Sequence, residues 1–208
     1  EKLDYKIAES KSRLDKAADV LAQSRRGVFE TLEKHIVSNL AELGMPNARF
    51  LVDCREADDY REDGRDVIQF LFSANKNGEL CEIPKVASGG EMSRLMLCIK
   101  ALLSTAKGLA TIIFDEIDTG VSGEIADRMG RIMKEMGRNI QVISITHLPQ
   151  IAAKGISHLK VSKRDTDKLT VSEIKKLNSE ERVLEIAGML SGSELSEAAL
   201  INARDLMS

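Results

Sequence analysis

The chain has 208 residues, of which 43% are hydrophobic and 30% charged, and its formal net charge is −3. This balance predicts a folded protein with one good core or two small ones, and it favours neither nucleic acid nor an anionic membrane surface as a bulk partner. No stretch of about 18 apolar residues and no basic-then-apolar leader occurs, so neither a membrane span nor a signal peptide is predicted. Three cysteines without metal-ligand spacing fit a reducing compartment, and we expect a cytoplasmic protein.

The amino-terminal segment has a heptad pattern, with charged or polar residues between the repeated positions. Apolar residues recur at intervals of seven: Ile7, Leu14, Leu21 and Val28. Two interpretations stay open. The segment is either one strand of a coiled coil whose antiparallel partner lies outside this chain, or a long amphipathic helix that packs on its own domain.

Beyond Pro46 the pattern changes from a helical to a strand period. We predict strands at 48–53 and 66–72, and a solvated loop in the charged stretch 54–65 between them. Asn77-Gly78 is a hairpin turn signal after the second of these strands.

A helix is predicted from about 90 to 106, and its centre is so apolar that neighbouring elements must cover it. Strands at 110–116 and 140–147 flank a helix from about 122 to 136, which makes a βαβ unit. Such a unit predicts a parallel sheet with its functional edge at the carboxyl ends of the strands. A hairpin and two closing helices are predicted after it: 158–165, 169–177, 179–190 and 193–207.

The apolar helix is preceded by Ser88, Gly89, Gly90 and Glu91. A helix start offers unpaired N–H groups and the positive end of the helix dipole, so a phosphate would fit there. The same residues also fit an ordinary N-cap with two turn glycines, in which Glu91 completes a capping box.

Two carboxylates, Asp115 and Glu116, stand at the carboxyl end of the first strand of the βαβ unit. Asp115 could hold Mg²⁺ through water, and Glu116 could orient or deprotonate an attacking water. An acidic pair can also simply cap the helix that follows a strand. His147 ends the second strand and could hydrogen-bond a terminal phosphate or the attacking water, or it could be an ordinary turn residue.

In this order and spacing, these residues resemble the ABC-type ATPases. "SGGE" at 88–91 is similar to the signature motif, "TIIFDE" at 111–116 to the Walker B strand with its catalytic glutamate, "IDTGVSG" at 117–123 to the D-loop, and "ITH" at 145–147 to the switch histidine. Transporter ATPases usually have proline after the glutamate, whereas Ile117 and Asp118 follow it here. This departure resembles the chromosome-maintenance and repair branch, which includes the SMC proteins and Rad50.

The resemblance implies an α/β fold: the C-terminal lobe of an ABC ATPase head at 44–208, a mainly parallel sheet flanked by helices, after the returning strand of a coiled coil at 1–43. It implies an ATPase of DNA double-strand-break repair and recombination, nucleoid-associated, with ATP and Mg²⁺ as cofactors. No G-x-x-x-x-G-K-[ST] occurs in the 208 residues. We therefore expect this chain to be inactive alone and to need the N-terminal lobe of the same protein.

The resemblance further implies a site shared by two heads of a homodimer. The catalytic residues and the metal ligand would serve nucleotide on their own head: Glu116, His147 and Asp115. The signature residues would contact nucleotide on the second head: Ser88, Gly89, Gly90 and Glu91. The D-loop would contribute Asp118 and Gly120 to the interface.

A basic cluster around the predicted hairpin could contact DNA, or it could be a solvated face. Its members are Lys160, Lys163, Arg164, Lys168, Lys175 and Lys176, of which the first four are the candidate DNA contacts. Two alternatives stay open for the chain as a whole: the head of another SMC/Rad50-type chromosome-maintenance ATPase, and a module that docks DNA or protein without catalysis.

Overall fold

The computed structural model describes residues 1–85, 89–105, 109–121, 123–165, 169–192 and 195–208. These residues form two compact units, Glu1–Leu95 and Met96–Ser208. Within the described residues, no helix combines the length and the apolar character needed to cross a membrane.

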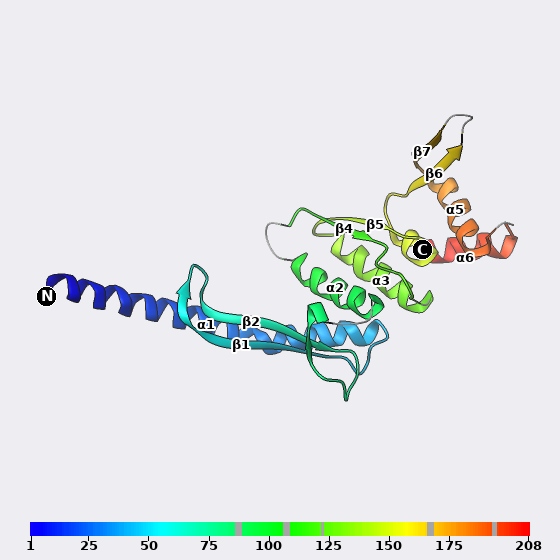
Figure 1. Cartoon of the computed structure of the whole chain (residues 1–208). Helices are drawn as coiled ribbons and strands as arrows, with labels where there is room; N and C mark the ends of the chain where they lie inside the picture. Colours follow the sequence, from blue (N-terminus) through cyan, green and yellow to red (C-terminus); the bar gives the residue numbers. More distant parts are fainter. Residues whose placement is uncertain (86–88, 106–108, 122, 166–168, 193–194) are drawn as a thin grey trace. The chain divides into compact units, whose positions relative to one another are not determined.

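The first unit consists of one long helix and an antiparallel hairpin that lies along it (Figure 1). Its elements are α1 Lys2–Glu42, β1 Arg49–Arg61, β2 Gly64–Ser73, β3 Cys81–Glu82 and a 3-10 helix Ile83–Lys85, after which α2 Gly89–Leu103 continues into the second unit. Strand β3 pairs with β2 beyond a turn in which the Gly78 N–H donates to the Asn75 carbonyl over 3.1 Å. The predicted hairpin turn is therefore confirmed.

Apolar side chains are buried where the carboxyl end of α1 meets the hairpin. They are Ile36, Leu40, Leu43, Phe50, Val52 and Phe72. The backbone N–H of Val52 donates to the Glu33 carboxylate over 2.7 Å, so the helix also supplies an acceptor to the hairpin. This end of α1 is thus anchored by both packing and hydrogen bonding.

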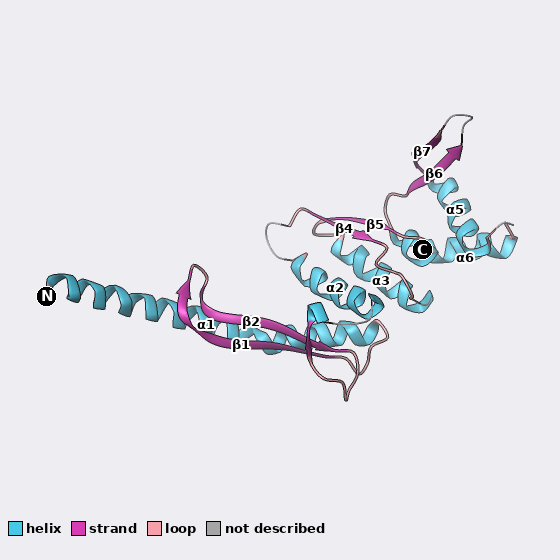
Figure 2. Ribbon diagram, viewed as in Figure 1, coloured by secondary structure: helices cyan, strands magenta, loops and turns pink. Residues whose placement is uncertain are grey.

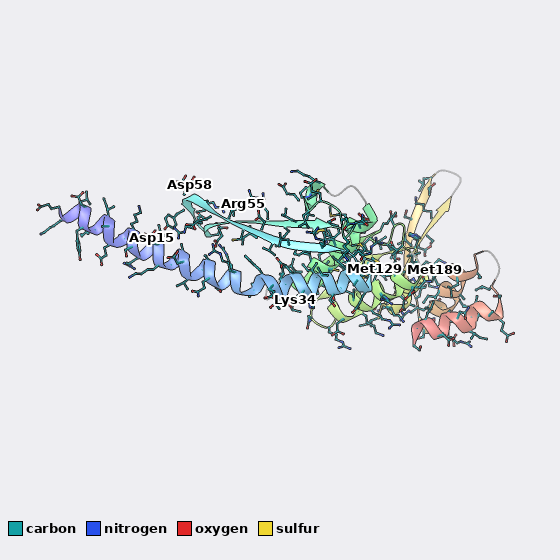
Figure 3. All side chains as sticks on the ribbon, turned by 90° about the horizontal axis from the view of Figure 1, so that it is seen from below. Asp15, Lys34, Arg55, Asp58, Met129 and Met189 are labelled. Atoms are coloured by element: carbon teal, nitrogen blue, oxygen red, sulfur yellow. The ribbon has the colours of Figure 1, made fainter. Side chains whose placement is uncertain are left out.

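Charged and polar side chains hold the other end of the hairpin to α1. Three side-chain hydrogen bonds join them: Arg25 to Asp66 over 3.0 Å, Arg65 to Asp19 over 2.6 Å, and Tyr60 to Asp15. Figure 3 labels Asp15 on α1, and Arg55 and Asp58 on the charged part of β1. The hydrogen bond to Asp15 raises the pKa of Tyr60.

The prediction of a solvated loop at 54–65 is therefore wrong, because β1 continues to Arg61 and β2 begins at Gly64. Ion pairs with α1 replace the apolar burial that usually marks a strand, so the period-2 pattern is absent here. Gly64 follows the tight turn with a φ of +99°, a left-handed conformation that favours glycine.

The second unit begins with the predicted βαβ arrangement, shown by secondary structure in Figure 2. Its elements are β4 Thr111–Asp115, α3 Gly123–Met136, β5 Gln141–Ile145, α4 Pro149–Lys154, β6 Leu159–Asp165, β7 Thr170–Lys176, α5 Ser179–Ser191 and α6 Glu197–Met207. Strands β4 and β5 are parallel, with Thr111 opposite Gln141 and Asp115 opposite Ile145. The predicted parallel pair is confirmed.

One face of the β4–β5 pair is buried and the other is exposed. Ile112 and Phe114 are buried, and the apolar face of α3 is buried through Ala126, Met129, Met133 and Met136. On the opposite face of the strands, Ile113, Ile143 and Ile145 are 58%, 40% and 53% exposed. Parallel strands are normally covered on both faces, so this sheet lacks half of its cover within the described residues.

The closing elements confirm the predicted hairpin and two helices. Strands β6 and β7 pair antiparallel, and α5 and α6 pack on α4 through a small core. That core contains Ala153, Ile186, Ala187, Ala199 and Ala203. Helix α5 begins with a capping box between Asn178 and Glu181. Helix α4 was not predicted, because its six residues are too few to show a helical period.

Candidate functional site

The two carboxylates and the histidine lie at one edge of the parallel sheet. Asp115 is the last residue of β4, Glu116 follows it, and His147 comes two residues after the end of β5. Asp115 is paired with Ile145, and the Glu116 N–H donates to the Ile145 carbonyl over 3.1 Å. The strand register therefore brings the titratable residues of both strands to the same edge, as the sequence predicted.

Glu116 has an unusual backbone conformation, with a φ of +46°. Among the described residues, it is the only non-glycine residue with positive φ. Such a conformation costs roughly 1 kcal/mol or more and persists only where neighbours impose it. Three contacts do so here: the bond to Ile145, and donation to the Glu116 carbonyl by the Thr119 N–H over 3.3 Å and the Thr119 hydroxyl over 3.0 Å. Strain of this kind occurs often at functional sites.

Both carboxylates are exposed and therefore accessible to a ligand. Their hard oxygen donors suit Mg²⁺, which keeps several waters and takes only one or two protein carboxylates beside phosphate oxygens. Within the described part of the chain, no group of three or more His, Cys, Asp or Glu residues is placed to hold a metal ion. The donor set at this edge thus fits a Mg²⁺ that depends on nucleotide phosphates for its other ligands.

Asp118 lies inside the second unit, with only 1% of its surface exposed. Its Oδ2 accepts a hydrogen bond from the Thr146 hydroxyl, which in turn accepts from the Leu148 N–H over 3.0 Å. Its Oδ1 has no hydrogen-bond partner among the residues described, and the His147 Nδ1 lies 4.0 Å from it. Thr146 lies within the "ITH" motif, but the sequence assigns it no role, and its only signal is its position beside His147.

The turn after Asp118 contains Gly120, which has a φ of +75°. The Val121 N–H donates to the Asp118 carbonyl over 3.3 Å and closes this turn. A residue with a side chain would be strained at position 120, so the turn requires glycine there.

The signature-like residues belong to the first unit. Gly89, Gly90 and Glu91 form the first turn of α2, and Ser88 lies outside the described residues. Gly89 is exposed, and a Cβ built on it would meet no atom of the described residues within 4 Å. The start of α2 thus leaves room for a ligand, in agreement with both the anion-binding and the capping interpretations.

The basic residues of the β6–β7 hairpin do not share one environment. Lys160 forms an ion pair with Glu185 on α5, whereas Lys163 is exposed. The side chain of Arg164, and Lys168 altogether, lie outside the described residues. At the base of the hairpin, the hydrogen bond from Lys175 lowers the pKa of Glu181. Part of the basic cluster therefore fastens the hairpin to α5.

Comparison with known proteins gives a consistent assignment, although no family model matches the chain. The DNA repair protein RecN of Vibrio cholerae is 37% identical over 192 residues, which are 92% of this chain and 35% of that protein. RecN of Halalkalibacterium halodurans is 34% identical over 99% of this chain and 37% of its own length, and RecN of Xylella fastidiosa is 36% identical over 100% and 38%. The chain thus spans a little over a third of the length of these relatives.

Solved structures show the same fold at lower identity. The Smc head domain with a coiled coil and joint from Pyrococcus yayanosii has a TM-score of 0.61 at 21% identity, over 86% of this chain and 33% of that one. The Smc head domain from Pyrococcus furiosus, bound to the C-terminal domain of ScpA, has a TM-score of 0.59 at 21% identity, over 86% and 44%. The chain is therefore a homologue of the RecN proteins, matched to them along nearly its whole length, and it has the fold of an SMC ATPase head.

Proposed function

We propose that the chain is the C-terminal ATPase lobe of a RecN-type protein, together with the returning strand of its coiled coil. The whole protein would hydrolyse ATP in DNA double-strand-break repair and recombination, and would bind or tether DNA in the cytoplasm, at the nucleoid. The observation that supports this proposal best is the placement of Asp115, Glu116 and His147 at one edge of a parallel sheet. Phosphoryl transfer needs groups that position the reactants and groups that stabilise charge. The residues at this edge are of both kinds.

The three residues have separate roles in this proposal. Asp115 would hold Mg²⁺, and the ion would supply positive charge that neutralises the phosphates of ATP when it is bound. Glu116 accepts a proton from the attacking water, and the three contacts described above hold its backbone at the end of β4. His147, whose side chain is 66% exposed, donates a hydrogen bond to the terminal phosphate.

The exposed face of the β4–β5 pair supports a second lobe as partner. Ile113, Ile143 and Ile145 form an apolar surface next to the carboxylates, and a two-stranded parallel sheet is not stable without cover. The N-terminal lobe of the same protein would cover this surface and supply the phosphate-binding loop that the 208 residues lack. Hydrolysis therefore requires both lobes, and we expect the 208 residues alone to be inactive.

The signature residues would act on nucleotide held by a second head, so that ATP joins a homodimer. Ser88, Gly89, Gly90 and Glu91 are proposed for this contact in trans, and the exposed Gly120 turn and Asp118 belong to the same interface loop. Crosslinking of full-length heads on addition of ATP, lost in a Ser88→Arg variant that still binds ATP, is the result we expect. Loss of ATP binding itself in that variant would argue against action in trans.

The heptad positions on α1 support the coiled-coil assignment for 1–43. Ile7, Leu14, Leu21 and Val28 remain exposed along the helix even though the hairpin packs on it. An antiparallel partner helix would cover this stripe. Proteolysis of the full-length protein checks this assignment, because the paired segment should resist cleavage that the same segment suffers in the 208-residue chain.

DNA contact at the β6–β7 hairpin is a second part of the proposal, supported by the exposure of Lys163 on a two-stranded ribbon of a size that fits a major groove. Arg164 and Lys168 are proposed with it, while Lys160 is already paired with Glu185. In the full-length protein, Lys163→Glu should weaken DNA binding and reduce the salt slope by about 1, which Lys134→Glu on α3 should not do. If the two changes weakened DNA binding equally, the effect would come from the net charge of the protein and not from contact at the hairpin.

The central test is Glu116→Gln in the full-length protein, compared with Glu124→Gln. Glu124 is another exposed glutamate of the second unit, paired with Arg128 on α3 over 2.8 Å. Loss of a general base should lower kcat by about 100-fold or more while ATP binding and head engagement persist. The Glu124 variant should keep kcat within about 2-fold, since its ion pair is a surface one. Unaltered turnover in Glu116→Gln would remove Glu116 from the role of base.

A further inference from the structure

Asp118 is a buried carboxylate that the proposed chemistry does not require. Its exposure is 1%, and among the described residues its only hydrogen-bond donor is the Thr146 hydroxyl, on Oδ2. Oδ1 is buried and has no partner in the described part of the chain. A buried charge without a counter-charge is costly, and an unsatisfied buried oxygen requires an explanation.

The position of Asp118 supplies that explanation. Thr146 bridges two loops, because its hydroxyl donates to Asp118 and accepts from the Leu148 N–H. His147 stands between Thr146 and Leu148 in sequence, and its Nδ1 lies 4.0 Å from the unpartnered Oδ1. This separation is too long for a hydrogen bond, and it would have to shorten by about 1 Å for the exposed imidazole to form one. Catalytic hydrogen bonds are often long before the substrate is bound.

We propose that Asp118 is a positioning residue for His147, resting on the role given to His147 above. When nucleotide is bound, both ring nitrogens carry a proton: Nδ1–H donates to Asp118 Oδ1, which fixes the ring orientation, and Nε2–H remains as the donor to the phosphate. The opposite ring nitrogen, Nε2, is then held toward the terminal phosphate. Thr146 holds the carboxylate in place through the other Asp118 oxygen, Oδ2. The loop that contains Asp118 and the loop that contains His147 would therefore move together within one head.

This role differs from a contribution to the interface between heads. The loop would take part in the proposed interface through its exposed Gly120 turn, whereas the Asp118 side chain is directed at groups of its own unit. It also differs from a purely structural role in the turn. The turn is closed by the Asp118 backbone carbonyl, which accepts from Val121 and does not need the side chain.

The test is a double-mutant cycle in the full-length protein, with kcat and KM for ATP measured in wild type, Asp118→Asn, His147→Ala and the double variant. Asparagine keeps the size of the side chain and an acceptor for Thr146, but it cannot provide acceptor oxygens to both partners. Asp118→Asn should lower kcat by about 10-fold or more with little change in KM, as expected when an orienting partner is lost. In the His147→Ala background the same change should have no further effect on kcat.

Two further variants separate positioning from folding. Asp127→Asn is the matched control, because Asp127 is a partly buried carboxylate of the same unit, paired with Lys154 over 3.4 Å, outside the motifs. Its kcat should stay at the wild-type value. If Asp118→Asn does not fold, Thr146→Val takes its place in the cycle, and Thr146→Ser should restore activity because it restores the hydroxyl.

The outcomes are distinguishable. Wild-type kcat in His147→Ala would overturn the role of the histidine in the proposed function. A second outcome is that His147→Ala lowers kcat and that Asp118→Asn then lowers it further, by the same factor as in the wild-type background. This outcome would overturn the positioning role alone. An unchanged kcat in Asp118→Asn would also overturn it, whereas a loss that vanishes in the absence of His147 supports it.

Discussion

Among the described residues, each unit buries one aspartate, and the surroundings of the two differ. In the first unit, Asp66 accepts from Arg25 over 3.0 Å, lies 3.9 Å from Arg26, and accepts from the Cys54 thiol over 3.8 Å. In the second unit, Asp118 has a single hydroxyl donor and a histidine just out of reach. Both side chains are almost fully buried. Asp66 thus joins two elements of its unit, whereas Asp118 keeps one carboxylate oxygen for the hydrogen bond proposed with His147.

The two units are also held together by different kinds of contact. The hairpin of the first unit is held on α1 by charges along much of its length, whereas α3 covers the second sheet with apolar side chains. Charge pairs specify a register but add little stability when exposed, while apolar burial is stronger and less specific.

The largest effect is expected for Asp66→Asn. The change leaves Arg25, which is mostly buried, without its counter-charge, so the free energy of unfolding should fall by about 2–4 kcal/mol. Urea unfolding of the chain, monitored by circular dichroism, measures this. Asp63→Asn is the control, because Asp63 is exposed and lies 3.8 Å from Arg61, and it should cost less than about 1 kcal/mol. Equal costs for the two variants would show that Asp66 is not a clamp.

A smaller effect on stability is expected for Asp118→Asn. The amide removes a desolvated charge that has no Lys or Arg partner among the described residues, and its oxygen can still accept from Thr146. The loss should therefore be about 1 kcal/mol or less by the same unfolding measurement. A cost as large as that of Asp66→Asn would break the comparison, since it would mean that both carboxylates are structural.

The smallest effect concerns His158, a half-buried residue whose ring nitrogen Nδ1 lacks a partner among the described residues. Burial lowers its pKa below 6.5, and the nearby Arg182 and Lys160 lower it further, against an opposing effect of Glu185. Below pH 6.5 the unfolded histidine binds a proton that the folded one resists, so stability is complete above this pH and decreases as the pH falls.

His158→Gln should flatten this dependence. The slope that one histidine contributes cannot exceed about 1.4 kcal/mol per pH unit, and we expect less because the site is only half buried. The measurement is the difference in urea midpoint between wild type and variant at several values of pH from neutral downward. A dependence that survives the substitution would have to come from other groups.

Most of the fold could be predicted from the sequence, because the hydrophobic period of a long segment shows whether it is a helix or a strand. The heptad segment, the βαβ unit and the closing hairpin with its two helices were all predicted. The charged half of the β1–β2 hairpin was missed since its strands are stabilised by ion pairs with α1, which no local period reveals. Such contacts between residues 41 or 46 positions apart are visible only in the folded chain.

The site was predictable to the extent that it depends on strand order. Parallel pairing places Glu116 and His147 at one edge of the sheet whatever the conformation of the loops that follow the strands. Their proximity therefore follows from the βαβ pattern. The bond between Asp118 and Thr146 does not follow, because it depends on the conformation of two loops 28 positions apart. The roles of these residues remain predictions, to be checked by the variants described above.

The positive φ of Glu116 has a consequence for laboratory evolution. A glycine at this position would relieve the backbone strain, and the folded chain would gain roughly 1 kcal/mol if nothing else changed. Selection for heat resistance alone would therefore favour the residue that lacks the proposed base. A search for more heat-stable variants should therefore keep glutamate at position 116, because stability favours glycine there and the proposed turnover requires the carboxylate.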